Sequence, residues 1–151
     1  VTRITSYNVC YTKLLRTSNG LAKLPPALQT YHPAFLLLQL GANDGLRGLS
    51  LAQMKSNLAK IIEMSQKANV KVLLIATQLP PNYGPIYLKK FKLVYSDLAK
   101  QYNIPLIPMF LEGVAGNPAF MQKDGLHPNQ QAQSKIMANV WATLAPMLNK
   151  K

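Results

Sequence analysis

Two continuous apolar runs of strand length stand out along the chain, at Phe35–Leu40 (FLLLQL) and Lys71–Thr77 (KVLLIAT). An uninterrupted apolar run is typical of a strand that is buried on both faces, as in a parallel sheet. A shorter run at Ile104–Pro108 predicts a third strand.

Three further segments show the periodicity of amphipathic helices, at Ser50–Ala68, Ile86–Tyr102 and Gln131–Leu148. Ser50 and Gln53 predict a capping box at the start of the first of them. Apolar residues three or four positions apart share one face of each helix, and we expect these faces to be buried. The residues concerned are Leu51, Met54, Leu58, Ile61, Ile62, Phe91, Val94, Tyr95, Leu98, Tyr102, Ile136, Val140, Trp141, Leu144 and Leu148.

Strands that alternate with helices predict an α/β fold, with a parallel sheet and helices on both of its faces. Ligands of such sheets bind beyond the carboxyl ends of the strands. Candidate chemistry is therefore expected in the turns that follow the apolar runs.

Composition and charge narrow the classes of function. The chain has 151 residues, which suits one domain, and its single cysteine, Cys10, excludes an intrachain disulfide and a cysteine-rich metal site. The formal net charge of +12 is compatible with an anionic partner such as nucleic acid or a phospholipid surface. The lysines are scattered, however, and only Lys89, Lys90 and Lys92 lie close together, so we expect an ordinary basic surface and no nucleic-acid partner. No apolar run is long enough to span a membrane.

The first candidate turn, Gly41-Ala42-Asn43-Asp44, directly follows the first apolar run. Glycine lets the chain leave the strand sharply, and an asparagine side chain at this edge can donate a hydrogen bond to a developing oxyanion. The alternative is an Asx turn, in which Asn43 and Asp44 bond to their own backbone.

The second candidate turn, Asp124-Gly125-Leu126-His127-Pro128, precedes the last helix. A carboxylate three residues before a histidine can accept the Nδ1–H of the ring and leave Nε2 as a general base. The alternative is a plain turn, with Asp124 as a local cap and His127 merely exposed. His32 has no catalytic partner nearby in the sequence and is predicted to be a surface residue.

Three motifs in this order, QLGANDGLRG, LPPNYG and KDGLHPN, resemble the SGNH (GDSL) hydrolase family, in particular its thioesterase I, lysophospholipase and arylesterase branch. The resemblance runs from about Thr17 to Leu148. It implies a three-layer α/β/α, flavodoxin-like fold. It also implies a monomeric serine esterase that cleaves small acyl esters or thioesters without a metal or cofactor. Members of this branch are often periplasmic or secreted.

The same resemblance implies roles for individual residues. Asp124 and His127 would be the acid and base of a Ser-His-Asp triad. Asn43 would be the oxyanion asparagine, with Gly41 in the same block. A mobile loop at Gly45–Leu49, with Gly45 and Leu46 at the substrate, would form one side of an acyl pocket. Leu79, Pro80 and Asn82 would form the other wall.

The sequence departs from the family at its beginning. The family carries its nucleophilic serine in a Gly-Asp-Ser motif after the first strand, and this chain contains no such motif. A second block, Gly-Asp-Thr/Ser, would fall near residues 15–18, which read Leu-Arg-Thr-Ser. Ile4–Leu14 (ITSYNVCYTKL) resembles the in-frame translation of the loxP recombination site. We therefore expect residues 1–16 to be a non-native linker, and residues 17–151 to be a truncated hydrolase domain without its first strand and nucleophile block.

Two functions stay open on this basis. The first is a serine esterase that is inactive as the chain stands, because the serine block is missing. The second is a non-catalytic relic of the same fold that binds acyl chains or lipids.

Overall fold

The computed structural model describes residues 16–125 and 127–149, so the predicted linker lies, apart from Arg16, outside the described residues. The chain divides into two compact units, with the boundary after Leu106. The helices and strands of the first unit are α1 (Thr17–Tyr31), β1 (Phe35–Leu38), α2 (Ala42–Leu46), α3 (Leu51–Lys67), β2 (Lys71–Ile75), the 3₁₀ turn η1 (Pro81–Tyr83) and α4 (Pro85–Tyr102).

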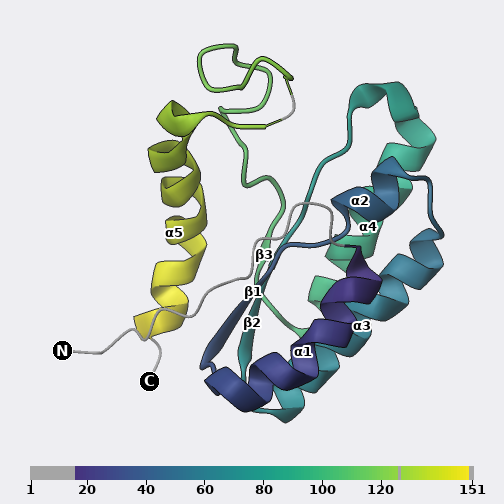
Figure 1. Cartoon of the computed structure of the whole chain (residues 1–151), viewed down its shortest axis with the longest axis vertical. Coiled ribbons are helices and arrows are strands. Elements are labelled where there is room, and N and C mark those ends of the chain that lie inside the picture. The colour runs from purple at the N-terminus through teal and green to yellow at the C-terminus, as the bar shows by residue number, and fades with distance from the viewer. Residues whose placement is uncertain (1–15, 126, 150–151) are drawn as a thin grey trace. The chain divides into compact units, whose positions relative to one another are not determined.

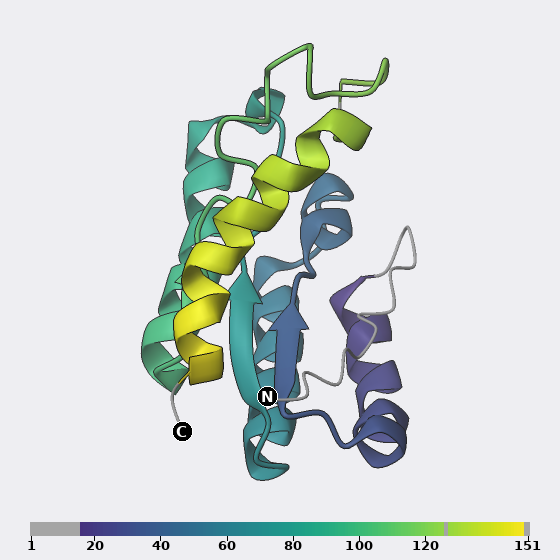
Figure 2. The same cartoon turned by 90° about the vertical axis from the view of Figure 1, so that its left-hand side faces the viewer.

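The sheet is parallel, as the apolar runs predict. Strands β1 and β2 pair in register, with Phe35 opposite Lys71 and Leu38 opposite Leu74, and Figure 2 shows both arrows pointing the same way. The short strand β3 (Leu106–Ile107), at the boundary between the units, follows β2 in the strand order. Both long strands are two residues shorter than predicted.

The first unit has one apolar core, formed between the sheet and the helices α1, α3 and α4 (Figure 1). Helix α3 packs against both α1 and α4. The predicted inward faces of α3 and α4 are confirmed, since their central residues are fully or almost fully buried: Met54, Leu58, Ile61, Ile62, Phe91, Val94, Tyr95 and Leu98. The hydroxyl of Ser50 accepts a hydrogen bond from the Gln53 backbone N–H at 3.2 Å, which confirms the Ser50 half of the predicted capping box.

Strand β2 is buried on both faces. Val72 and Leu74 point into the core on the helical side, and Leu73 and Ile75, which alternate with them, are also buried. This double burial explains why the strand reads as a continuous apolar run.

Helix α1 contains two consecutive prolines, Pro25 and Pro26. Prolines inside a helix remove backbone donors, so the sequence alone favours a break here. The helix nevertheless continues to Tyr31, and Leu24 holds it in the core against α3. His32 ends the helix in the left-handed conformation with φ of 42° and is exposed, as predicted.

The second unit consists mainly of turns, followed by η2 (Gln130–Ala132) and α5 (Gln133–Asn149). The prediction for α5 is wrong at Trp141, which is 51% exposed, and no residue of α5 is fully buried. The other predicted inward residues of this helix are half-buried, namely Ile136, Val140, Leu144 and Leu148. The described buried apolar residues of this unit are few, namely Ile107, Val114 and Ala132.

Candidate active site

Gly41 makes the sharp exit from β1 that the sequence predicts. Its φ is 114°, a conformation that only glycine adopts easily. A side chain at this position would also collide with the hydroxyl of Tyr95, and its Cβ would lie 3.0 Å from Met54 Cε. Glycine is therefore required here both by the backbone and by the packing.

The hydroxyl of Tyr95 ties the ends of the two long strands together. It donates to the carbonyl of Leu40 at 2.7 Å and lies 2.8 Å from Thr77 Oγ1. Burial raises the pKa of Tyr95 well above its ordinary value, so the hydroxyl stays protonated. The Leu40 carbonyl lies beyond the end of β1 at Leu38, and its hydrogen bond is to a side chain.

Asn43 and Asp44 lie in the five-residue helix α2, not in an open turn. Asn43 is half-buried at the second position of this helix. Asp44 is buried, and it bonds to a distant residue and not to its own backbone, as the Asx-turn alternative would require. Its carboxylate accepts from the Thr17 backbone N–H at 2.9 Å and from the Thr17 hydroxyl at 2.6 Å.

The Asp44 carboxylate is the centre of a buried polar network. It lies at the N-terminus of α1, where the unpaired N–H groups and the helix dipole favour a negative charge. Asn57 donates to the Thr17 hydroxyl at 3.0 Å, and Gln53 donates to Asn57 at 3.0 Å. The network therefore joins α2, which carries Asn43, to α1 and α3. No local signal in the sequence identifies Thr17 as the partner.

The predicted acyl-pocket residues lie in two segments that contact each other. Gly45 and Leu46 belong to α2, so the predicted loop begins only after them. Gly45 is buried, and a Cβ there would lie 2.8 Å from Leu79. Pro80 is half-buried, whereas Leu46 and Asn82 are exposed. This close packing favours a glycine at position 45, while the predicted role of Gly45 at the substrate stays a prediction.

Two tyrosines that the sequence did not single out hold α2 in place. Tyr83 donates to the carbonyl of Leu46 at 2.7 Å, and Tyr87 donates to the carbonyl of Gly45 at 3.2 Å. Burial, together with the neighbouring Tyr83 hydroxyl, raises the pKa of Tyr87. These bonds satisfy backbone carbonyls at the end of a very short helix.

In the second unit, Asp124 and His127 form the hydrogen bond that their spacing predicts. His127 Nδ1 lies 2.6 Å from Asp124 Oδ2, and the His127 backbone N–H donates to Asp124 Oδ1 at 3.0 Å. An ionised carboxylate can only accept, so the proton of the neutral ring lies on Nδ1 and Nε2 is free of it. Gly125, with φ of 66°, allows the chain to turn between the two residues.

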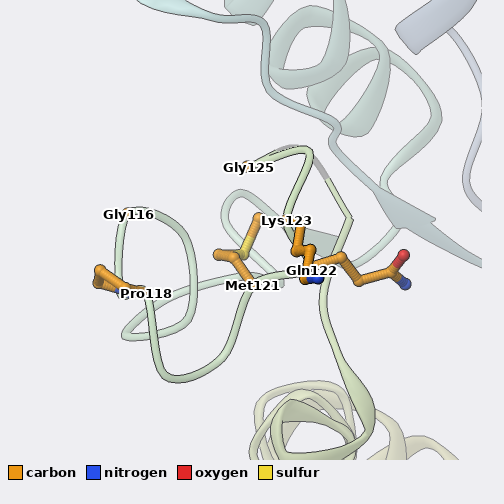
Figure 3. A pocket seen from close by; sticks show the side chains of 6 residues that line it. All are labelled: Gly116, Pro118, Met121, Gln122, Lys123 and Gly125. Atoms are coloured by element: carbon orange, nitrogen blue, oxygen red, sulfur yellow. The ribbon is translucent and has the colours of Figure 1, made fainter.

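Backbone bonds brace this turn from both sides. The Gln122 N–H donates to the His127 carbonyl at 2.7 Å, and Met121 bridges to Pro128 in antiparallel fashion. A shallow hollow of about 410 Å³ adjoins the turn, and Figure 3 shows it. Lys123 and Gly125, which flank Asp124 in the chain, are among its lining residues.

The candidate residues thus form two local clusters, one in each unit. Gly41 and Asn43 lie in the first unit, and Asp124 and His127 lie in the second. That Asn43 and His127 converge on one cleft stays a prediction. Among the described residues no group of three His, Cys, Asp or Glu side chains could hold a metal ion.

Comparison with known proteins adds independent findings. The family model for the GDSL-like Lipase/Acylhydrolase family matches residues 7–135. The Esterase TesA of Pseudomonas aeruginosa is 47% identical over 132 residues, which cover 87% of this chain and 66% of the relative. Thioesterase 1/protease 1/lysophospholipase L1 of Escherichia coli K12 is 41% identical over 133 residues, which cover 88% of this chain and 64% of the relative.

A solved structure has the same fold. The crystal structure of the psychrotrophic esterase EstA from Pseudoalteromonas sp., inhibited by monoethylphosphonate, superposes with a TM-score of 0.85 at 36% identity, covering 90% of this chain and 74% of that one. The predicted α/β fold of the SGNH hydrolases is confirmed by this similarity. The chain spans about two thirds of the length of the relatives it matches, 66% and 64%. Its sequence and its fold together show that the chain belongs to the GDSL-like Lipase/Acylhydrolase family.

Proposed function

We propose that this chain is part of an acyl hydrolase that cleaves small carboxylic esters or thioesters through a Ser-His-Asp mechanism, and that the chain is inactive as it stands because it lacks the serine. The observation that carries the proposal is the 2.6 Å contact between His127 Nδ1 and Asp124 Oδ2. The relatives named as esterase and thioesterase support the substrate class.

In this mechanism Asp124 orients the ring of His127 and stabilises its positive charge once it has taken a proton. Nε2, which carries no proton in the resting tautomer, removes the proton of the attacking serine hydroxyl and returns it to the leaving group. Asn43 donates a hydrogen bond to the tetrahedral oxyanion. The Tyr95 bond to Leu40 and the Asp44 bonds to Thr17 hold the two ends of the segment that carries Asn43.

The nucleophile has to come from a Gly-Asp-Ser motif, which the 151 residues do not contain. We therefore expect the chain on its own to show no covalent labelling by a serine-directed phosphonate. Replacing residues 1–16 by a segment that carries Gly-Asp-Ser should restore both labelling and hydrolysis of a short p-nitrophenyl ester.

Variants of the restored chain test the assigned roles. His127→Ala should lower kcat by about 10³-fold or more. Asn43→Ala should lower kcat by about 100-fold with little change in KM, because an oxyanion donor acts mainly in the transition state. His32→Asn is the matched control, since His32 is exposed and asparagine tolerates its left-handed backbone. A folded, restored chain that binds acyl chains without turnover would instead support the binding relic.

A further inference from the structure

The outer face of helix α4 combines exposed apolar and basic side chains. Ile86, Lys89, Lys90 and Leu93 are spaced at i, i+3, i+4 and i+7, so they lie on the same face over two turns. Ile86 is 73% exposed and Leu93 is 45% exposed, and both lysines are exposed. The opposite face of this helix carries the core residues Phe91, Val94, Tyr95 and Leu98.

The apolar part of this face continues onto α2. Leu46 is 41% exposed, and the Tyr83 hydroxyl bonds to its carbonyl, which places the end of α2 against the start of α4 (Figure 1). Arg47, the next residue, is also exposed. A hollow of about 310 Å³ lies within the same surface, with Tyr83, Ile86, Tyr87 and Lys90 among its lining residues. We call Leu46, Arg47, Ile86, Lys89, Lys90 and Leu93 the α4 surface.

Each acidic side chain of the first unit bonds to a partner other than Lys89 and Lys90. Asp44 is buried on Thr17, and Glu63 accepts from the Tyr102 hydroxyl at 2.5 Å. Asp97 lies on the same helical face, four residues beyond Leu93 and seven beyond Lys90, about 10 Å along the helix from that lysine, and it is paired with Lys55 at 2.8 Å. The positive charge of Lys89 and Lys90 therefore faces solvent together with large apolar side chains.

This combination fits one kind of partner. Nucleic acid is bound mainly by basic and polar side chains and by stacked aromatic rings, so it would leave the exposed Ile86 and Leu93 without a role. A helix lying flat on a bilayer uses both, since its apolar side chains enter the acyl boundary while lysines at its flanks contact anionic headgroups. We infer that the α4 surface docks this chain onto an anionic phospholipid bilayer. This inference goes beyond the proposed hydrolysis and does not depend on it.

The test is sedimentation of the full chain with vesicles of phosphatidylcholine, with and without phosphatidylglycerol, at physiological salt. The chain should bind the anionic vesicles and bind the neutral ones far more weakly. Each basic side chain near an anionic surface strengthens binding about fivefold, so the double variant Lys89→Gln/Lys90→Gln should bind about 25-fold more weakly. The control variant Lys60→Gln/Lys67→Gln removes the same charge from exposed positions of α3. It should lose much less affinity for the anionic vesicles and bind nearly as tightly as the unmodified chain.

A second pair of variants tests the apolar contribution. Ile86→Ser/Leu93→Ser should weaken vesicle binding by about tenfold or more, while Met137→Ser, at a position that is 69% exposed on α5, should not. Circular dichroism of each variant controls for folding. Equal loss in the two lysine pairs would overturn the inference, as would full binding by Ile86→Ser/Leu93→Ser. Tighter binding to a short DNA duplex than to the vesicles would assign the surface to nucleic acid instead.

Discussion

The buried carboxylate of Asp44 offers the sharpest test of how this fold is held together. Replacing Asp44 by alanine removes the acceptor of both Thr17 hydrogen bonds, at 2.9 and 2.6 Å. The Thr17 N–H and hydroxyl are then left without this acceptor in a site where Thr17 is 0% exposed. Bonds to a charged acceptor contribute about 1.5–3 kcal/mol each, and the relief of burying the carboxylate offsets part of that loss. We expect Asp44→Ala to lower the free energy of unfolding by about 3–5 kcal/mol.

The chain provides a matched control in Asp97. Its carboxylate is also paired, with Lys55 at 2.8 Å, but the two side chains are 50% and 38% exposed. Solvent screens such a pair, so Asp97→Ala should cost less than about 1 kcal/mol. Asp44→Asn keeps the size of the side chain but points an amide donor at a Thr17 donor, and should cost about 2 kcal/mol.

Urea unfolding followed by far-ultraviolet circular dichroism measures all three variants. A double-mutant cycle of Asp44→Ala with Thr17→Val should show a coupling energy of about 2 kcal/mol, because each variant removes the same bond. If Asp44→Ala and Asp97→Ala differ by less than about 1 kcal/mol, the network is not the anchor of α1 and α2 that the geometry indicates.

Three further predictions concern the same unit. Gly41→Ala should lower the free energy of unfolding by about 3 kcal/mol, because of the positive φ at this position and the collision with Tyr95. Gly48→Ala is the control, since Gly48 has a φ of 62° but open space around it, and it should cost about 1 kcal/mol in the same urea assay. Tyr95→Phe should lower the unfolding free energy by about 1–3 kcal/mol, since it leaves the partly buried Leu40 carbonyl without its donor, and unchanged stability would contradict that bond. The hydrogen bond to Glu63 raises the pKa of Tyr102 from 10.0 to about 12. The contribution of this hydrogen bond to stability is therefore present below pH 10 and is lost as the pH rises towards 12. Phenolate absorbance should show this ionisation moving back towards 10.0 in Glu63→Gln, and an unchanged titration would refute the assignment.

Much of the first unit could be predicted because its signals are local. A continuous apolar run such as Lys71–Thr77 has few alternatives to a strand buried on both faces, and the helical periodicity of α3 and α4 directly marks their inner sides. The contact between Asp124 and His127 could be predicted for the same reason, since the two residues are three apart in a turn with a glycine.

Other features depend on contacts between residues far apart in the sequence. Asp44 finds its partner Thr17 27 residues away, and Tyr95 bonds to a carbonyl 55 residues away. Helix α1 runs through Pro25 and Pro26, against their local preference, because its apolar side packs on α3. Local pattern also predicts too much in one place, since the apolar periodicity of α5 predicts that Trp141 is buried, whereas it is half exposed.

The sequence by itself therefore determined the family, the parallel sheet and the histidine–aspartate pair, because each depends on motifs or on periodicities of a few residues. Only the tertiary structure decided that Asp44 is an anchor for α1, that Gly45 is a packing position in α2, and that Tyr83 and Tyr87 hold α2. These roles arise when distant segments meet in a desolvated interior, where every polar group needs a partner and every extra atom needs space. No pattern in the sequence identifies in advance which distant residue will be the partner of a buried polar group.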